Sequence, residues 1–238
     1  ASYGLLALVA KTLYKTPFVY TIHYSPPSGS FWTRLMYRIE LDLLLPFVAQ
    51  KADRVVTISS YVQSLLKQKY NIEAEVVYHG INAAMSHCDA SSSRDFILAK
   101  YGIPDDYKLF LYVGRFHGYK DLETAIKAFS IVLKEKRFKI KFLVVGKGEM
   151  ERSIKQEVLR NNVEDHVLFL GDIENGELEK LYTGSDVFVF PSIGEGFGLV
   201  FLEAMICGLP IIASSEGSSP EVVGDAGLIF TAKDPNNL

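Results

Sequence analysis

The chain has few cysteines and no long hydrophobic run. Only two of its 238 residues are cysteines, Cys88 and Cys207, and their wide separation has neither metal-ligand nor redox spacing. We therefore expect free thiols and a reducing, cytoplasmic compartment. The longest apolar stretch, residues 41–49, is interrupted by Asp42 and Pro46. It is much shorter than the roughly 20 residues that a membrane-spanning helix needs, so the sequence predicts no transmembrane segment.

Sequence signals of several common functions are also missing. With 25 basic and 28 acidic residues, the net charge of −3 argues against a protein that binds nucleic-acid phosphates. Walker A, D-x-D, H-x-x-x-H and C-x-x-C patterns are absent, so we expect neither a metal site nor a bound cofactor. Gly146 and Gly148 begin a G-x-G-x-x-G pattern, but Glu151 stands in place of the third glycine. A nicotinamide-dependent enzyme is therefore disfavoured.

The composition that remains is typical of packed domains, with 48% hydrophobic and 22% charged residues. Strand-like and helix-like segments alternate along the chain. The predicted strands cover residues 18–22, 54–58, 75–78, 109–113, 142–145, 167–170, 187–190 and 210–213. The predicted helices cover residues 31–50, broken near Pro46, and 60–69, 122–134, 150–160, 178–183 and 199–207. This alternation predicts parallel sheets covered by helices on both faces.

One segment, residues 79–93, has no periodicity and is small and polar, ending in the run Ser91, Ser92, Ser93. We expect a linker there and a domain boundary near residue 90, which gives two domains, residues 1–89 and 90–238. The chain opens with Ala1 rather than Met, and no basic segment precedes an apolar run. We therefore expect it to be an internal part of a longer protein.

The richest chemical signal is the segment 195–203, which follows the predicted strand 187–190. Gly196 and Gly198 allow a ligand to approach the backbone, and the start of the next helix offers N–H groups to phosphate or sugar oxygens. Glu203 is expected about one turn into that helix, where it can accept hydrogen bonds from a vicinal diol such as a ribose. The alternative interpretation is a helix with an acidic first turn and glycines needed for packing.

A second cluster lies after the predicted strand 109–113, where Gly114 and Arg115 are followed by Lys120. Arginine offers a planar fork to phosphate oxygens and lysine a mobile charge, so the pair can hold a diphosphate and stabilise it as it leaves. Two basic residues in a loop are also common on solvated surfaces, and that alternative stays open.

His23 ends an apolar strand, and this position favours a functional role over a satisfied structural side chain. For His79 and His117 the structural interpretation is preferred. The basic run 134–141 and the amphipathic helix from residue 31 are compatible with contact to an anionic membrane surface, at the inner face of the cell membrane. A solvated surface is the alternative.

Together these residues resemble the retaining glycosyltransferases of family 4, which include sucrose and glycogen synthases and bacterial mannosyltransferases. The most specific element is the E-x7-E segment from Glu195 to Glu203, between the flanking segments 190–192 and 204–210. Gly114 and Arg115 with Lys120, the turn 145–148 and the segments 219–223 and 227–228 support it. The resemblance implies an α/β protein of the GT-B type, with two Rossmann-like domains and an incomplete N-terminal domain.

The implied activity is transfer of a hexose from a nucleotide-sugar to an acceptor hydroxyl, with retention at the anomeric carbon and without a required metal. Mannose and glucose are the leading donor sugars, followed by N-acetylhexosamine. The partners implied are a GDP- or UDP-hexose and a sugar or lipid-linked acceptor, as in glycan or glycolipid synthesis, with no nucleic acid.

The resemblance also assigns residue roles. Arg115 and Lys120 hold the diphosphate, and Glu203 binds the ribose hydroxyls. The donor sugar contacts Glu195, Gly196, Phe197, Gly198 and Leu199. The base sits near Gly146 and the 171–173 turn, which includes Ile173, and Gly114 and Gly148 are further donor-binding residues. His23 faces the donor sugar from the acceptor domain, so that Glu195, Arg115, Lys120 and His23 form the catalytic set.

Two departures from the family pattern matter. The chain has Tyr78-His79-Gly80 where members often have Pro-Asn-Gly, and it lacks the first strands of the usual acceptor domain. We therefore expect this piece alone to be a poor catalyst. Two alternatives stay open: a nucleotide-sugar epimerase or hydrolase of GT-B fold, similar to UDP-N-acetylglucosamine 2-epimerase, and a non-catalytic nucleotide-sugar binding module.

Overall fold

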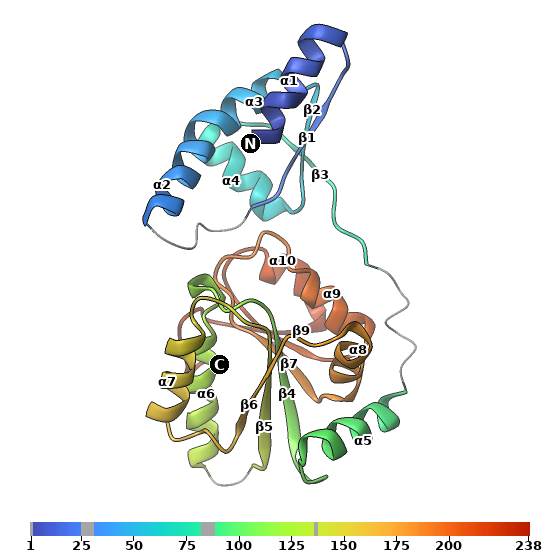
Figure 1. Ribbon diagram of the computed structural model, residues 1–238, viewed down its shortest axis with the longest axis vertical. Coiled ribbons are helices and arrows are strands. Elements are labelled where there is room, and N and C mark those ends of the chain that lie inside the picture. Colours follow the sequence, from blue (N-terminus) through green and yellow to red (C-terminus); the bar gives the residue numbers. More distant parts are fainter. Residues whose placement is uncertain (1, 25–30, 82–88, 136–137) are drawn as a thin grey trace. The chain divides into compact units, whose positions relative to one another are not determined.

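A computed structural model describes residues 2–24, 31–81, 89–135 and 138–238 (Figure 1). The chain divides into two compact units, residues 1–80 with 194–197, and residues 81–193 with 198–238. Each unit has its own parallel sheet. Cys88, and Lys136 and Arg137 of the basic run, lie outside the described residues.

The N-terminal unit contains a three-stranded parallel sheet in the order β1-β2-β3. Its strands are β1 (Val19–Ile22), β2 (Arg54–Thr57) and β3 (Glu75–Val76). Its helices are α1 (Ser2–Tyr14), α2 (Phe31–Ile39), the π-helical turn η1 (Glu40–Leu44), α3 (Leu45–Lys51) and α4 (Ser60–Tyr70). All three strands lie where the sequence predicts them. The core of the unit is apolar side chains of α3 and α4, among them the fully buried Val48 and Val62.

The predicted break at Pro46 is wrong. The chain stays helical from α2 through α3, and the irregularity is the π-helical turn η1 that precedes Leu45. Pro46 is the second residue of α3, directly after this irregular turn, and it has no N–H to donate to the turn before it. The predicted cap of the next helix is confirmed, because the Ser59 hydroxyl accepts a hydrogen bond from the Val62 N–H at 3.2 Å.

The C-terminal unit contains a six-stranded parallel sheet in the order β6-β5-β4-β7-β8-β9. The strands are β4 (Lys108–Val113), β5 (Ile140–Val145), β6 (Val167–Gly171), β7 (Val187–Phe190), β8 (Ile211–Ser214) and β9 (Gly227–Phe230). The helical segments are α5 (Ala90–Tyr101), η3 (Gly118–Lys120), α6 (Leu122–Lys134), α7 (Glu151–Arg160), α8 (Asn175–Gly184), α9 (Leu199–Ile206), α10 (Ser219–Val223) and η4 (Gly224–Ala226). In Figure 1, α6 and α7 lie on one side of this sheet and α5, α8 and α9 on the other. The predicted doubly covered parallel sheet is confirmed.

Helix α5 occupies residues that the sequence assigns to the linker. Its first turn is capped by Asp89, whose carboxylate accepts a hydrogen bond from the Ser92 N–H at 2.8 Å. The small side chains allow close packing. Ser93 is buried, and a Cβ added to Gly184 of α8 would lie 2.7 Å from the backbone nitrogen of Arg94. Small residues therefore let α5 and α8 approach closely. The sequence of α5 has no apolar stripe at helical spacing, and for this reason the helix was not predicted.

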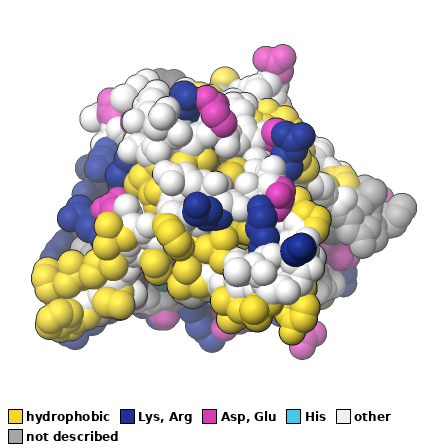
Figure 2. Space-filling view, turned by 90° about the horizontal axis from the view of Figure 1, so that it is seen from above, with side chains coloured by type: hydrophobic (Ala, Val, Ile, Leu, Met, Phe, Trp, Pro, Cys, Tyr) yellow, Lys and Arg dark blue, Asp and Glu magenta, His cyan; other side chains and the backbone are white. Residues whose placement is uncertain are grey.

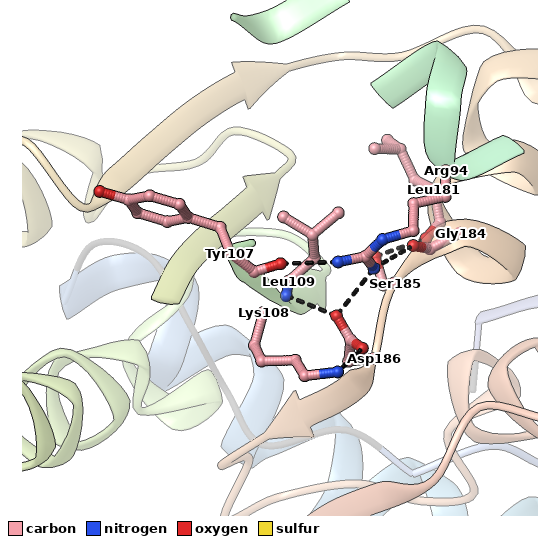
Figure 3. A network of polar contacts seen from close by, with 8 residues as sticks. All are labelled: Arg94, Tyr107, Lys108, Leu109, Leu181, Gly184, Ser185 and Asp186. Atoms are coloured by element: carbon pink, nitrogen blue, oxygen red, sulfur yellow. Dashed lines mark hydrogen bonds and ion pairs between the residues drawn. The ribbon is translucent and has the colours of Figure 1, made fainter. Parts of the chain in front are cut away.

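A half-buried polar network fixes α5 to the sheet (Figure 3). The Arg94 guanidinium donates to the Asp186 carboxylate at 2.9 Å and to the Tyr107 carbonyl at 2.6 Å. Asp186 also accepts from the Leu109 N–H at 2.8 Å and the Lys108 ammonium at 3.1 Å. Burial alone raises the pKa of Asp186, but these hydrogen bonds outweigh it and hold the pKa below its usual value. The carboxylate is therefore charged and bonded at neutral pH.

Candidate functional site

The six parallel strands of the C-terminal unit bring their carboxyl ends, and the loops that follow them, to one edge of the sheet. The strand order reverses between β4 and β7, because β5 and β6 lie on one side of β4 and β7 to β9 on the other. In open α/β sheets ligands bind outside the carboxyl ends of the strands at this switch point. The loops after β4 and β7, which carry most of the predicted site residues, flank it.

Backbone hydrogen bonds join the loops after β4, β5 and β6 into one surface. They run from the Gly114 N–H to the Val145 carbonyl (3.1 Å), from Phe116 to Lys147 (2.9 Å) and from Gly146 to Gly171 (2.8 Å). The structure thus brings together Gly114, Arg115, Gly146, Gly148 and the turn that contains Ile173. Arg115 is exposed on this surface and Ile173 is half-buried.

The two glycines after β5 have a structural reason of their own. Gly146 has a φ of 120°, and a Cβ added there would lie 2.1 Å from the Gly114 carbonyl oxygen. A Cβ on Gly148 would lie 2.5 Å from the Phe116 carbonyl oxygen. Glycine is therefore required for the loops after β4 and β5 to touch, whether or not a ligand is present.

Lys120 ends the short helix η3 and lies close to the switch point. Its ammonium is 4.8 Å from the centre of the Phe190 ring, the last residue of β7, and 5.1 Å from that of Tyr119. The Tyr119 carbonyl accepts hydrogen bonds from the Ile193 N–H at 2.8 Å and the Ser192 hydroxyl at 3.2 Å. The β4 and β7 loops are thereby tied together, with a cation held over an aromatic face beside them.

Helix α9 follows Gly198, whose φ of 87° is a left-handed value that glycine adopts freely. Leu199 is the first helical residue, and Glu203 lies half-buried one turn later, as the sequence predicts. The Glu203 carboxylate accepts a hydrogen bond from the Tyr182 hydroxyl at 2.7 Å. Burial, followed by the nearby Glu203 carboxylate, raises the pKa of Tyr182 well above its usual value, so the phenol stays protonated. Sequence reasoning missed Tyr182, because nothing in its neighbourhood distinguishes it from other core aromatics.

Four predicted residues belong to the N-terminal unit. Glu195, Gly196 and Phe197 fall in the segment 194–197, which groups with that unit by its contacts, and all three are buried. His23 follows the carboxyl end of β1, and its ring stacks on that of His79 with centroids 5.2 Å apart.

The surroundings of His23 keep it uncharged. Partial burial, followed by the neighbouring His79, lowers the pKa of His23 below its usual value, so the imidazole is neutral at pH 7. The ring lines a cavity of about 200 Å³ whose other lining residues include Tyr24, Arg38 and Lys69 and several apolar side chains. The predicted structural role of His79 gains support from the stacking, whereas the role of His23 stays a prediction.

Metal-binding clusters and membrane-spanning helices are both absent from the described residues. Within residues 2–24, 31–81, 89–135 and 138–238, no three His, Cys, Asp or Glu side chains gather in a way that could hold a metal ion. Over the same ranges no helix has the length and apolar character to cross a bilayer. Cys207 is half-buried.

Comparison with known proteins gives consistent results. Residues 93–238 match the family described as Glycosyl transferases group 1, and residues 1–84 match Glycosyltransferase Family 4. The chain is 31% identical to an uncharacterized glycosyltransferase of Methanocaldococcus jannaschii over 78% of its length and 48% of that protein. It is also 31% identical to O-antigen chain mannosyltransferase B of Escherichia coli, over 79% of the chain and 49% of the relative. The chain thus spans about half the length of these relatives.

Solved structures agree on the fold. The crystal structure of HepE from Anabaena in complex with UDP and glucose superposes with a TM-score of 0.81 at 21% identity. The superposition covers 98% of this chain and 63% of the HepE chain. The two sheets therefore have the arrangement of strands and helices seen in GT-B glycosyltransferases.

Proposed function

The chain belongs to the glycosyl transferases group 1 family, and we propose that it forms the donor-binding part of a retaining hexosyltransferase. In this proposal residues 90–238 bind the nucleotide-sugar, and residues 1–89 form part of the acceptor side. The observation that carries it is the position of Lys120 at the switch point of the six-stranded sheet, with Glu203 one turn into α9 after the adjacent strand β7.

The proposed chemistry rests on the attraction between the positive charges of Arg115 and Lys120 and the negative charge of the leaving diphosphate. Negative charge grows on the diphosphate as the bond to the anomeric carbon breaks, and fixed cations in a protein site stabilise such charge. Arg115 offers a bidentate fork and Lys120 a point charge for that task. Glu203 accepts hydrogen bonds from the ribose hydroxyls. No step in this account needs a metal ion.

The remaining site residues face the sugar and the base. Glu195, with the backbone from Gly196 to Leu199, contacts the donor sugar, and His23 approaches it from the acceptor side. The base lies against the surface formed by Gly114, Gly146, Gly148 and Ile173. The hydrogen bonds that join these loops support a preformed base site.

The donor is proposed to be a GDP- or UDP-hexose carrying mannose or glucose. The Escherichia coli relative is a mannosyltransferase, and HepE was crystallised with UDP and glucose, which supports these two sugars as first candidates. The acceptor hydroxyl belongs to a sugar or a lipid-linked sugar. A nucleotide-sugar epimerase or hydrolase on the same fold remains the alternative, and release of a free sugar or an epimer without acceptor would identify it.

Isothermal titration with UDP, GDP and ADP tests the donor site. We expect one nucleotide to bind at least tenfold more tightly than the other two, because the loop surface presents one fixed set of backbone donors and acceptors to the base. Glu203→Ala should weaken that nucleotide about tenfold or more through lost hydrogen bonds to a charged group. Equal affinity for all three nucleotides, or none for any, would argue against the proposal.

We also propose that the N-terminal unit contacts an anionic membrane through α2. The apolar stripe of this helix faces solvent, with Phe31 and Trp32 72% and 71% exposed and Met36 63% exposed. Tyr37 of the same helix, away from this stripe, is half-buried instead. The helix therefore turns its apolar side outward, the reverse of a helix that packs on its own core. In the view of Figure 2, hydrophobic side chains lie on the surface with Lys and Arg side chains among them.

Charge favours an anionic surface as the partner. Residues 1–80 contain eight basic and five acidic residues, whereas the chain as a whole is negative. Aromatic and aliphatic side chains beside basic ones are the composition of helices that lie in the headgroup region of anionic bilayers. The basic run 134–141 lies in the other unit and is not needed for this proposal.

Vesicle co-sedimentation tests the membrane contact. We expect binding to vesicles of phosphatidylcholine with phosphatidylglycerol, little binding to phosphatidylcholine alone, and loss of binding at high salt. Trp32→Ser with Met36→Ser should weaken binding at least tenfold, since burial of each large apolar side chain contributes about 1.5–3 kcal/mol. Leu159→Ser, at an exposed position of α7, is the matched control and should leave binding unchanged. Self-association that the double variant abolishes would instead identify a second copy as the partner.

A further inference from the structure

The contact between Tyr182 and Glu203 joins two helices that are separated in sequence by strand β7. Tyr182 lies near the end of α8 and Glu203 lies in α9, and the phenolic hydroxyl donates to the carboxylate at 2.7 Å. Tyr182 is fully buried, whereas Glu203 is half-buried. The carboxylate is thus bonded on its inner side by a group that solvent cannot reach.

The tyrosine ring has little freedom to move. It packs against Phe188 of β7 with ring centroids 5.6 Å apart, and Leu181 beside it is also fully buried. A hydroxyl on a rigid, buried ring stays at a fixed point relative to the sheet. Glutamate, by contrast, has three rotatable side-chain bonds, and ordering them for a ligand costs conformational entropy. A fixed donor can supply that ordering before the ligand arrives.

The hydrogen bond also leaves the carboxylate able to bind a ligand. A carboxylate has about four lone-pair positions on its two oxygens, and the tyrosine hydroxyl occupies one of them, on Oε2. A vicinal diol needs two acceptor positions. The remaining lone pairs of the Glu203 carboxylate can accept from such a diol.

We propose that Tyr182 is a positioning residue that orients the Glu203 carboxylate for the ribose hydroxyls of the nucleotide. This inference rests on the proposed function, because it takes Glu203 as the ribose ligand. Tyr182 itself touches no substrate. Its contribution is expressed only through Glu203, which separates it from a residue that merely supports the core.

The test compares nucleotides that differ only in the ribose hydroxyls. UDP and 2′,3′-dideoxy-UDP, or the corresponding GDP pair, are titrated into the protein and into its Tyr182→Phe variant. We expect the wild type to prefer the ribonucleotide by at least about tenfold, from two hydrogen bonds to a charged group. Tyr182→Phe should reduce this preference at least threefold and leave the affinity for the dideoxynucleotide unchanged. A purely structural role would weaken both nucleotides equally and would overturn the inference.

A double variant, with both residues replaced, tests whether Tyr182 acts through Glu203. In a Glu203→Ala background, Tyr182→Phe should have no further effect on the ribose preference. Tyr101→Phe is the matched control, since the Tyr101 hydroxyl also donates to a glutamate, Glu177, between α5 and α8. It should leave the preference as it is in the wild type. Thermal unfolding of each variant, measured alongside, shows that it is folded.

The outcomes separate the two proposals. If the wild type binds no nucleotide, the proposed function fails and the positioning role fails with it. If the wild type prefers the ribonucleotide and Glu203→Ala abolishes that preference, but Tyr182→Phe does not reduce it, only the positioning role is overturned.

Discussion

Replacing Lys120 with methionine is expected to lower the rate constant of sugar transfer by about 10²- to 10³-fold, the usual cost of removing one group that stabilises transition-state charge. The measurement is kcat with the preferred nucleotide-sugar, made on the full-length protein that contains this chain. The expected loss is in kcat more than in KM. The ground-state diphosphate has other partners, whereas the charge that develops on its leaving oxygen depends on a nearby cation.

The geometry explains why this lysine is fixed enough to matter. The Lys120 ammonium lies over the Phe190 ring at 4.8 Å, and the Tyr119 carbonyl beside it is tied to the β7 loop through Ile193 at 2.8 Å. A cation held in this way loses less freedom on binding a phosphate than one on an open surface. Methionine keeps most of the unbranched stem that packs on the ring and removes only the charge.

Lys155→Met is the matched control, because Lys155 lies on the exposed side of α7 and pairs with Glu151 one turn away at 2.7 Å. Such surface pairs contribute little to stability, and the substitution should change kcat by less than about twofold. Equal rates for the Lys120 variant and the wild type would show that the diphosphate binds elsewhere. A change confined to KM would show that Lys120 binds the diphosphate equally well in the ground state and the transition state.

Most of the strands and helices could be predicted from the sequence, whereas α1, α5, α10 and β9 were not. The bounds of α6, Leu122–Lys134, match the prediction, because apolar residues at helical spacing alternate there with charged ones. Helix α5 and the π-helical turn η1 were missed for different reasons. In the sequence, the serines at the start of α5 are typical of a linker. In the structure, Gly184 of α8 packs against the backbone at Ser93 and Arg94. A π-helical turn has no periodic signature that separates it from the α-helices on either side.

The candidate site residues also divide into those that the sequence indicates and those that only the structure reveals. Lys120 and Glu203 could be selected as candidates, because residue type and position after a buried strand narrow the set of candidate site residues. Tyr182 could not be found, since its role comes from a contact 21 residues away that exists only once α8 packs beside α9. The glycines after β5 were assigned to ligand binding, yet the structure shows that they are first needed for contact between two loops. A sequence pattern indicates that glycine is required there but not which atom approaches it.

Gly146→Ala is expected to destabilise the C-terminal unit by about 3 kcal/mol or more, through a backbone conformation that alanine avoids and through overlap with the backbone. The added Cβ would lie 2.1 Å from the Gly114 carbonyl oxygen and 2.9 Å from its carbon. The loop cannot shift away without loss of the hydrogen bonds from Gly146 to Gly171 and from Gly114 to Val145. Denaturant unfolding of the variant and the wild type measures the difference.

The matched control for this prediction is Gly176→Ala, in the first turn of α8. A Cβ added at Gly176 meets nothing within 4 Å, and alanine favours a helix over glycine by about 0.5–1 kcal/mol. The same chemical change should therefore stabilise the protein at one position and destabilise it at the other. Opposite signs would locate the cost of Gly146→Ala in the contact between the β4 and β5 loops. Similar small effects at both positions would show that these loops can separate, and the rigid surface proposed for the nucleotide base would then be wrong.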